Sequence, residues 1–302
     1  EALDWARKGM QFDSTSTEMN IQYAKVVAQS QGADAGLLYL KNMIAKYSYS
    51  IEYRLALADL YRLTERYKDS MELYEALIES HPKEKAAHMG LGDARYALGT
   101  YDKALKSYLQ ASIIDTSDPE CLFKAGLVFL ESGKYPEAIA QLSRALEKNP
   151  LYPKAHYYIG KSYLLLGKLN EALGEAQQEK KMNPNIAEPY ILAAEVYLKN
   201  KEFTNCASEY QTVLKLRPQG AAIYVKAAHC YRLAENLDIA ENMLSVGMTK
   251  ENGFPELYKE QGAIFERRNL PEEAVTAYRM YIKLSPNTPD RAEICQKLQS
   301  MG

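Results

Sequence analysis

One stretch of the sequence has the residue types to bind a phosphate group. Residues 155–162, Ala-His-Tyr-Tyr-Ile-Gly-Lys-Ser, match a permissive phosphate-loop pattern in which Ala155 replaces the first glycine. A working phosphate loop follows a β-strand and holds the phosphates with the free amides of a glycine-rich turn. Here the segment lies inside an expected helix, where the amides are already hydrogen-bonded. We therefore expect no nucleotide site and no cofactor.

The histidines and cysteines form no recognisable catalytic or metal-binding motif. They are His81, His88, His156 and His229, and Cys121, Cys206, Cys230 and Cys295. No pair of cysteines has the CxxC spacing of a zinc site, and no histidine lies in an HExxH or nucleophile motif. We predict no catalytic residue and no metal ligand, so the chain is not expected to be an enzyme.

A period of 34 residues organises the chain. The blocks are 17–50, 51–84, 85–118, 119–152, 153–186, 187–220, 221–254 and 255–288. In the block at 119–152, Ser132-Gly133 separates two apolar-periodic runs and Asn149-Pro150 ends the second, because proline disfavours helix in the residue before it. Each block therefore reads as two helices and a turn. Self-similarity at such a period predicts a repeat architecture.

Two positions in every block carry a small residue. The eighth residues are Ala24, Ala58, Gly92, Gly126, Gly160, Ala194, Ala228 and Gly262. The twentieth residues are Gly36, Ser70, Ala104, Ala138, Ala172, Cys206, Ala240 and Ala274. Small residues that face each other let two antiparallel helices approach closely.

With these residues the chain resembles the tetratricopeptide repeat family over nearly its whole length. The resemblance implies an all-α fold, a right-handed superhelix of antiparallel helix pairs with an inner groove. A lone helix pair cannot bury its apolar face, so neighbouring pairs must stack. Residues 1–16 are expected to be the second helix of a truncated repeat, which indicates a fragment of a longer protein. Residues 289–302 are expected to form a capping helix with Asp290 as N-cap, burying Ala292, Cys295 and Leu298.

Cys206 and Cys230 have two alternative states. Both fall at small or apolar core positions of the repeat, which favours buried free thiols. A disulfide between them, across neighbouring repeats, is the alternative in an oxidising compartment. The location of the protein stays open: reduced cysteines favour the cytoplasm, and the bacterial periplasm is the other candidate.

The overall composition excludes two classes of partner. The formal net charge is −2, which argues against a general binder of nucleic acid or anionic membranes. No apolar stretch is long enough to cross a membrane. The expected partner is a protein or peptide.

In this family the fifth, ninth and twelfth residues of each block mostly face the groove, and their i, i+4, i+7 spacing puts them on one helical face. The predicted partner groove consists of Arg62, Tyr96, Phe123, Leu127, Leu130, Tyr157, Lys161, Leu164, Ile191, Glu195, Leu198 and Arg232. Its centre is an apolar stripe, Tyr96–Leu130–Leu164–Leu198, and an exposed apolar run usually marks a contact surface. The alternative is that the fifth residues belong to the core between helices. The ninth residues include no asparagine, so the family's carboxylate clamp is not expected.

Two charged residues break the repeat pattern. Arg95 replaces the usual aromatic residue of its block, and we expect its stem to pack while its head reaches solvent. Glu179 stands where other blocks have a small residue, and we expect it to be exposed or paired, because burying an unpaired carboxylate is costly.

The sequence thus predicts an adaptor that binds a partner segment along its groove. Two alternatives stay open. The chain is a regulatory or substrate-docking region of a larger enzyme, or it is a structural adaptor that assembles with itself as a homo-oligomer.

Overall fold

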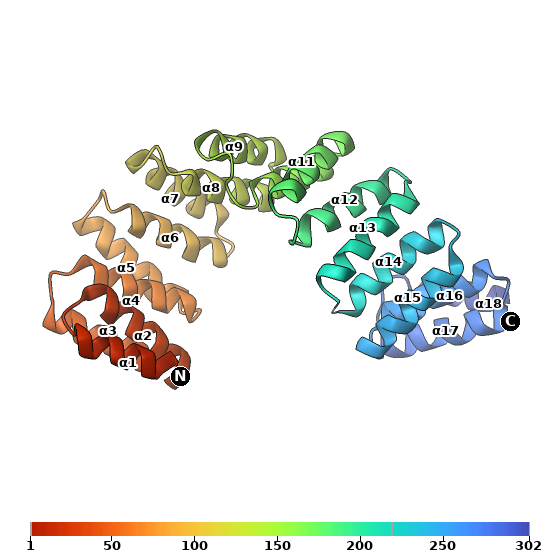
Figure 1. Cartoon of the computed structure of the whole chain (residues 1–302), viewed down its shortest axis with the longest axis horizontal. Helices are drawn as coiled ribbons and strands as arrows, with labels where there is room; N and C mark the ends of the chain where they lie inside the picture. The colour runs from red at the N-terminus through yellow and green to blue at the C-terminus, as the bar shows by residue number, and fades with distance from the viewer. Residues whose placement is uncertain (1, 219, 302) are drawn as a thin grey trace. The chain divides into compact units, whose positions relative to one another are not determined.

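The computed structural model describes residues 2–218 and 220–301, and within them it has eighteen helices and no strand (Figure 1). The helices are α1 (Ala2–Phe12), α2 (Thr17–Gln31), α3 (Ala33–Lys46), α4 (Ile51–Leu63), α5 (Tyr67–Ser80), α6 (Lys85–Ala97), α7 (Tyr101–Ile114), α8 (Pro119–Glu131), α9 (Tyr135–Lys148), α10 (Ala155–Leu165), α11 (Leu169–Met182), α12 (Glu188–Lys199), α13 (Phe203–Leu216), α14 (Ala221–Leu233), α15 (Leu237–Lys250), α16 (Pro255–Arg267), α17 (Pro271–Leu284) and α18 (Arg291–Met301). The fold is an all-α solenoid of successive helix pairs, as predicted.

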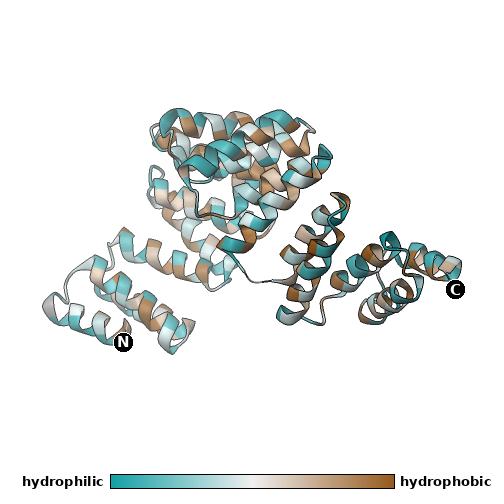
Figure 2. Cartoon of the chain, turned by 45° about the vertical axis from the view of Figure 1, so that its right-hand side comes forward, coloured by the Kyte–Doolittle hydropathy of each residue, from teal (hydrophilic) through white to brown (hydrophobic). Residues whose placement is uncertain are grey.

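The chain forms two compact units, residues 2–155 and 156–301. The first holds α1 to α9, and the second holds α10 to α18, with the boundary in the first turn of α10. Along the helices apolar and polar segments alternate (Figure 2), as expected where each helix buries one face against its neighbours.

Small residues bring the two helices of a pair together. A Cβ atom on Gly36 would lie 2.6 Å from the carbonyl oxygen of Ala24, and one on Gly126 would lie 2.6 Å from Cγ of Leu142. One on Gly92 would lie 2.5 Å from the ring of Tyr108. The prediction of close approach at these positions is confirmed, because no larger side chain fits there without displacing its neighbour.

In the seven blocks from residue 51 to residue 288, the turn inside the helix pair uses a left-handed residue at the fifteenth position of the block. The φ angles are positive at Glu65, Gly99, Gly133, Gly167, Lys201, Glu235 and Asn269. A residue in this conformation ends a helix and lets the amides that follow bond to its last carbonyls. At Gly133, for example, the next amide, that of Lys134, donates to the carbonyl of Phe129 at 2.9 Å. Glycine adopts this conformation without steric cost.

The final helix covers the end of the second unit, and the predicted face is partly right: Leu298 packs there and Cys295 is half-buried. Ile294 is buried and packs with Tyr278 and Tyr281, whereas Ala292 is exposed. Isoleucine is the larger apolar group, and Leu298 lies one turn further along the same face. Asp290 begins the helix, since its carbonyl accepts from the amide of Ile294, but its side chain accepts from the Tyr281 hydroxyl at 2.7 Å.

No helix in the described part of the chain combines the length and the apolar character needed to span a membrane.

Candidate functional site

A pocket of about 490 Å³ opens on the second unit, along α12, α14 and α16, the first helices of the last three repeats, and along the final helix α18. Its apolar lining is Leu198, Tyr210, Val225, Ala263, Tyr278 and Ile294. The remaining lining side chains are charged or are histidine. A pocket with apolar walls and a few oriented polar groups is the usual form of a ligand-binding site.

The fifth, ninth and twelfth positions of the repeat meet in this pocket. On α14 they are Val225, His229 and Arg232, and all three line it. On α16 they are Lys259, Ala263 and Glu266, which also line it. These six residues lie on one face of each helix, as their spacing requires, and Arg232 is the one that was among the predicted groove residues.

Three of the twelve predicted groove residues line the pocket: Glu195, Leu198 and Arg232. In the second unit, Tyr157 and Ile191 pack at the edges of hydrophobic clusters, which supports the alternative that fifth-position residues belong to the core. Lys161 is half-buried and lies outside the pocket. In the first unit, four of the predicted groove residues are half-buried: Arg62, Tyr96, Phe123 and Leu127.

The prediction of an exposed apolar stripe is wrong for Leu130 and Leu164. Each is only 5% exposed. Leu164 is sealed by a cluster that includes Leu192 and Val196 of α12, so the next repeat covers it. A glutamate at either position would therefore disturb the packing of the helices around it.

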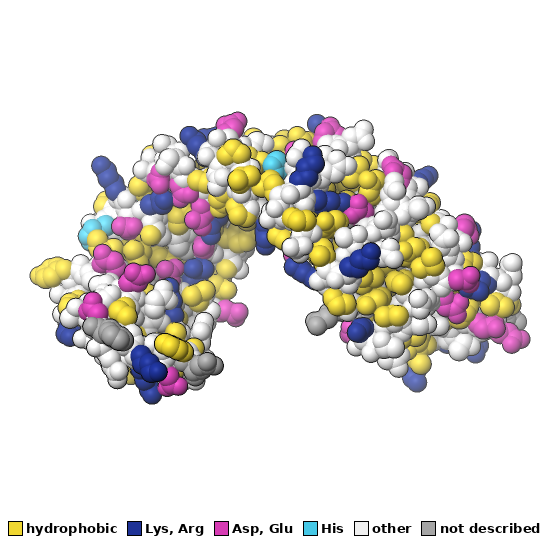
Figure 3. Space-filling model, viewed as in Figure 1, with side chains coloured by type: hydrophobic (Ala, Val, Ile, Leu, Met, Phe, Trp, Pro, Cys, Tyr) yellow, Lys and Arg dark blue, Asp and Glu magenta, His cyan; other side chains and the backbone are white. Residues whose placement is uncertain are grey.

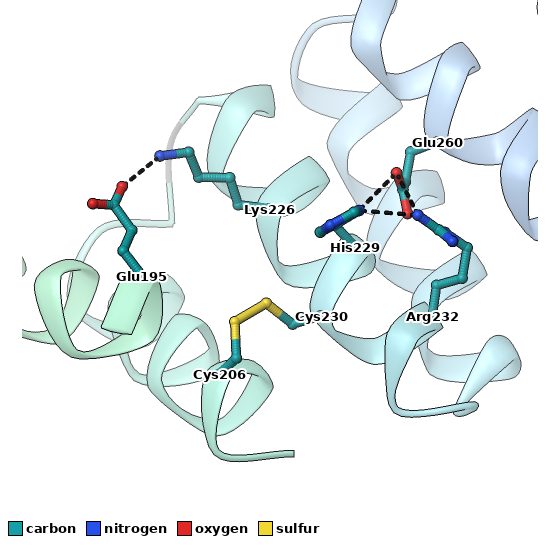
Figure 4. Close-up of a disulfide and its surroundings, with 7 residues drawn as sticks. All are labelled: Glu195, Cys206, Lys226, His229, Cys230, Arg232 and Glu260. Atoms are coloured by element: carbon teal, nitrogen blue, oxygen red, sulfur yellow. Dashed lines mark hydrogen bonds and ion pairs between the residues drawn. A yellow bond between two sulfur atoms is a disulfide. The ribbon is translucent and has the colours of Figure 1, made fainter. Parts of the chain in front are cut away.

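Glu260 is the most enclosed charge of the pocket (Figure 4). Its side chain is 10% exposed. Oε1 accepts a hydrogen bond from Arg232 Nε at 2.5 Å, and Oε2 lies 3.2 Å from Nδ1 of His229. Burial alone would raise the pKa of Glu260, but the hydrogen bonds from His229 and Arg232 outweigh it, and the pKa is lowered. Glu260 is thus ionised at neutral pH, and its carboxylate holds the guanidinium of Arg232 in place.

Ion pairs also link neighbouring repeats across this face. Lys226 lies 3.2 Å from Glu195, and Lys297 lies 3.0 Å from Glu266. In each pair the lysine follows the carboxylate by 31 residues, which places it on the next repeat. These ion pairs were not predicted from the sequence. The signal was available, because opposite charges recur at that spacing.

The first unit has a related polar network on α4, α6 and α8. Asp93 accepts from Lys124 Nζ at 2.6 Å and from the Tyr108 hydroxyl at 2.8 Å. Asp59 accepts from Arg62 at 3.2 Å and from the Tyr74 hydroxyl at 2.6 Å. Arg62 is therefore held by carboxylates of its own chain. On the face seen in Figure 3, basic and acidic side chains are interspersed in both units.

The two charged residues that break the repeat pattern are both paired. Glu179 is buried and accepts from Asn183 Nδ2 at 2.8 Å and from the amide of Tyr157 at 3.3 Å, as its burial requires. The head of Arg95 reaches the half-exposed Glu75 at the surface, but it is not free there. Its guanidinium donates to Glu75 at 2.8 Å and to Ser107 at 2.9 Å, because these residues of α5 and α7 flank it.

Cys206 and Cys230 form a disulfide that joins α13 to α14 (Figure 4). The favoured prediction of free thiols is wrong for this pair, and the alternative of a bridge between neighbouring repeats holds. The sulfur atoms meet because the twentieth position of one repeat packs on the tenth position of the next. Cys121 and Cys295 are free.

Loss of this bridge should destabilise the second unit. The double substitution Cys206→Ala and Cys230→Ala is expected to lower the free energy of unfolding by roughly 3 kcal/mol, since the bridge closes a loop of 24 residues in the unfolded chain. Urea titration of the oxidised chain with and without reductant measures this effect, and the variant should not respond to reductant. Alkylation of all four cysteines in the denatured, unreduced chain would contradict the assignment.

The segment that resembles a phosphate loop lies in α10, as expected of a helix and not of a nucleotide-binding turn. A Cβ atom on Gly160 would lie 2.8 Å from Leu192, so this glycine serves helix packing.

Comparisons with known proteins agree with the helix-pair fold. A family model described as tetratricopeptide repeat matches residues 55–119, and one described as TPR repeat matches residues 126–167. Low calcium response locus protein H of Yersinia pestis is 29% identical over 138 residues, which cover 46% of this chain and 79% of that protein.

Two solved structures share the fold at low identity. The C-terminal part of a TPR repeat-containing protein from Cytophaga hutchinsonii is 16% identical with a TM-score of 0.65, over 81% of this chain and 99% of that chain. A chain of the APC/C hetero-tetramer Cut9-Hcn1 is 14% identical with a TM-score of 0.60, over 99% of this chain but only 58% of that chain. With the small-residue positions, the helix pairs and both family matches in agreement, the chain belongs to the tetratricopeptide repeat family.

Proposed function

We propose that this chain is a protein-interaction adaptor and that the pocket on α12, α14, α16 and α18 binds a segment of its partner. The tetratricopeptide repeat fold supports a protein-binding role in general. The observation that carries the proposal is the pocket itself, whose volume of about 490 Å³ is within the range of sites that take up a ligand. Its apolar lining would accept side chains of the partner, and its ion pairs would fix the partner's direction.

The proposal assigns no catalysis to this chain. The lysines and the arginine of the pocket are held in ion pairs with carboxylates of the chain, as Arg232 is with Glu260. A catalytic acid or base needs access to the group it protonates or deprotonates. Binding accounts for the pocket without such a group.

Filling the pocket tests the proposal. Peptides are first selected on the wild-type chain from a displayed library of random sequences. Ala263→Trp puts an indole into the pocket, and we expect it to weaken the selected peptides by at least about tenfold, or about 1.4 kcal/mol. Fluorescence polarisation with labelled peptides gives the dissociation constants.

The matched control is Ala222→Trp, which adds the same side chain at an exposed position of α14 outside the pocket. It should leave the dissociation constants unchanged. Equal binding by wild type and by Ala263→Trp would mean that the partner segment does not use this pocket. Circular dichroism of both variants shows whether the helices are retained.

A further inference from the structure

We infer that the pocket of the second unit recognises a basic partner segment, an extended stretch in which lysine or arginine stands beside aliphatic side chains. This inference rests on the proposed function and names the chemical class of its partner. It follows from which charges around the pocket are already compensated within the chain.

Every lysine and arginine that lines the pocket has a carboxylate partner in the described part of the chain. The pairs are Lys226 with Glu195, Arg232 with Glu260, Lys297 with Glu266, and Lys259 with Asp290. An acidic partner would have to break one of these pairs before it could form its own. The pocket therefore offers no ready cation to a carboxylate ligand.

Two carboxylates of the lining are left over. Glu256 of α16 and Glu293 of α18 are both exposed, and neither makes an ion pair with a described residue. Against the effect of burial, the hydrogen bond to Asp290 raises the pKa of Lys259, and Glu293 contributes less to that rise. The rim of the pocket thus carries uncompensated negative charge, which a cationic side chain of a partner would balance.

The apolar lining lies beside these carboxylates. Val225 of α14 and Ala263 of α16 line the same pocket, and Ala263 is too small to fill the space in front of it. A segment with an aliphatic residue next to lysine or arginine would bury the first group here and place the second near Glu256 or Glu293.

Glu256 and Glu293 also have a simpler explanation. Both lie in the first turn of a helix, where a carboxylate favours the helix through the macrodipole. That role predicts a small loss of stability for Glu→Gln and no change in binding. Glu272 and Glu273 occupy the first turn of α17 outside this pocket, so they provide a matched control for the same charge change.

The experiment uses three fluorescein-labelled peptides of equal length and leucine content, with lysine, glutamine or glutamate at alternate positions. Fluorescence polarisation with the whole chain should rank them lysine, glutamine, glutamate in decreasing affinity, and added salt should weaken the lysine peptide most. Glu256→Gln with Glu293→Gln should weaken the lysine peptide about two- to tenfold, as for two exposed ion pairs. Glu272→Gln with Glu273→Gln should not.

The outcomes separate this inference from the proposed function. If the glutamine or glutamate peptide binds as tightly as the lysine peptide and Ala263→Trp abolishes that binding, the charge preference is wrong and the pocket assignment stands. If Glu272→Gln with Glu273→Gln weakens the lysine peptide as much as Glu256→Gln with Glu293→Gln does, the peptide is attracted to any acidic surface of the chain. That result also overturns the inference. If no peptide binds, or if Ala263→Trp has no effect, both proposals fail.

Discussion

Gly36→Ala in α3 is expected to lower the free energy of unfolding of the first unit by about 1–2 kcal/mol, although alanine is the better helix former. The added Cβ atom would lie 2.6 Å from the carbonyl oxygen of Ala24 and 2.6 Å from Cβ of Ala28. Both belong to α2 and are fixed by its backbone, so the two helices must move apart. A gain of about 1 kcal/mol in helix propensity does not offset that overpacking.

Urea titration followed by circular dichroism measures the effect. The matched control is Gly174→Ala in α11, where a Cβ atom would meet nothing within 4 Å. This substitution should stabilise the second unit by about 0.5–1 kcal/mol, measured by circular dichroism. A neutral or stabilising Gly36→Ala would show that α2 and α3 are not in close contact.

Glu260→Ala is expected to lower the free energy of unfolding of the second unit by about 3–5 kcal/mol. It would leave the guanidinium of Arg232, whose side chain is 13% exposed, without its carboxylate. Removing one partner of a buried pair strands the other charge, which costs far more than the pair itself contributes. The measurement is a urea titration followed by circular dichroism.

Glu195→Ala is the matched control on the same face. Glu195 and Lys226 also link neighbouring repeats, but their side chains are 40% and 49% exposed, so the loss should stay below about 1 kcal/mol. Equal effects of the two substitutions would contradict the burial of Glu260.

The Glu260 interaction should also depend on pH. Its pKa is lowered in the folded chain from the usual value of 4.5. The stabilisation is therefore fully present above about pH 4.5 and is lost as the pH falls through the lower folded value. Wild type should lose this part of its stability in acid, and Glu260→Ala should not.

Most of the fold could be predicted from the sequence because the residues that each helix contact requires recur at the same positions of every block. Gly36 or Gly126 alone would be an ordinary glycine, but a small residue at the same position of every block indicates a helix contact. The left-handed turn was harder to see, because Glu65 and Lys201 occupy it as well as glycine. Backbone geometry fixes that position, and the residue type varies.

The pocket was only partly predictable, and the reason is burial. Helical spacing gave the correct face at Val225, His229 and Arg232, but it does not tell how far a side chain extends. Leu164 at the twelfth position is covered by the next repeat, whereas Leu198 and Arg232 at the same position line the pocket. The stacking of the repeats decides which charged side chains form ion pairs with a neighbouring repeat. The lining charges that remain unpaired are the ones that can interact with a partner.

Photo-crosslinking from inside the pocket tests the central claim most directly. The photoreactive amino acid benzoylphenylalanine replaces Ala263 in one variant and the exposed Ala222 in the other, and each is irradiated with the lysine-containing peptide. A crosslinked product is expected from position 263, competed away by unlabelled peptide, and none from position 222. Equal crosslinking from both positions, or none from position 263 with a peptide that binds, would contradict the claim that this pocket holds the partner.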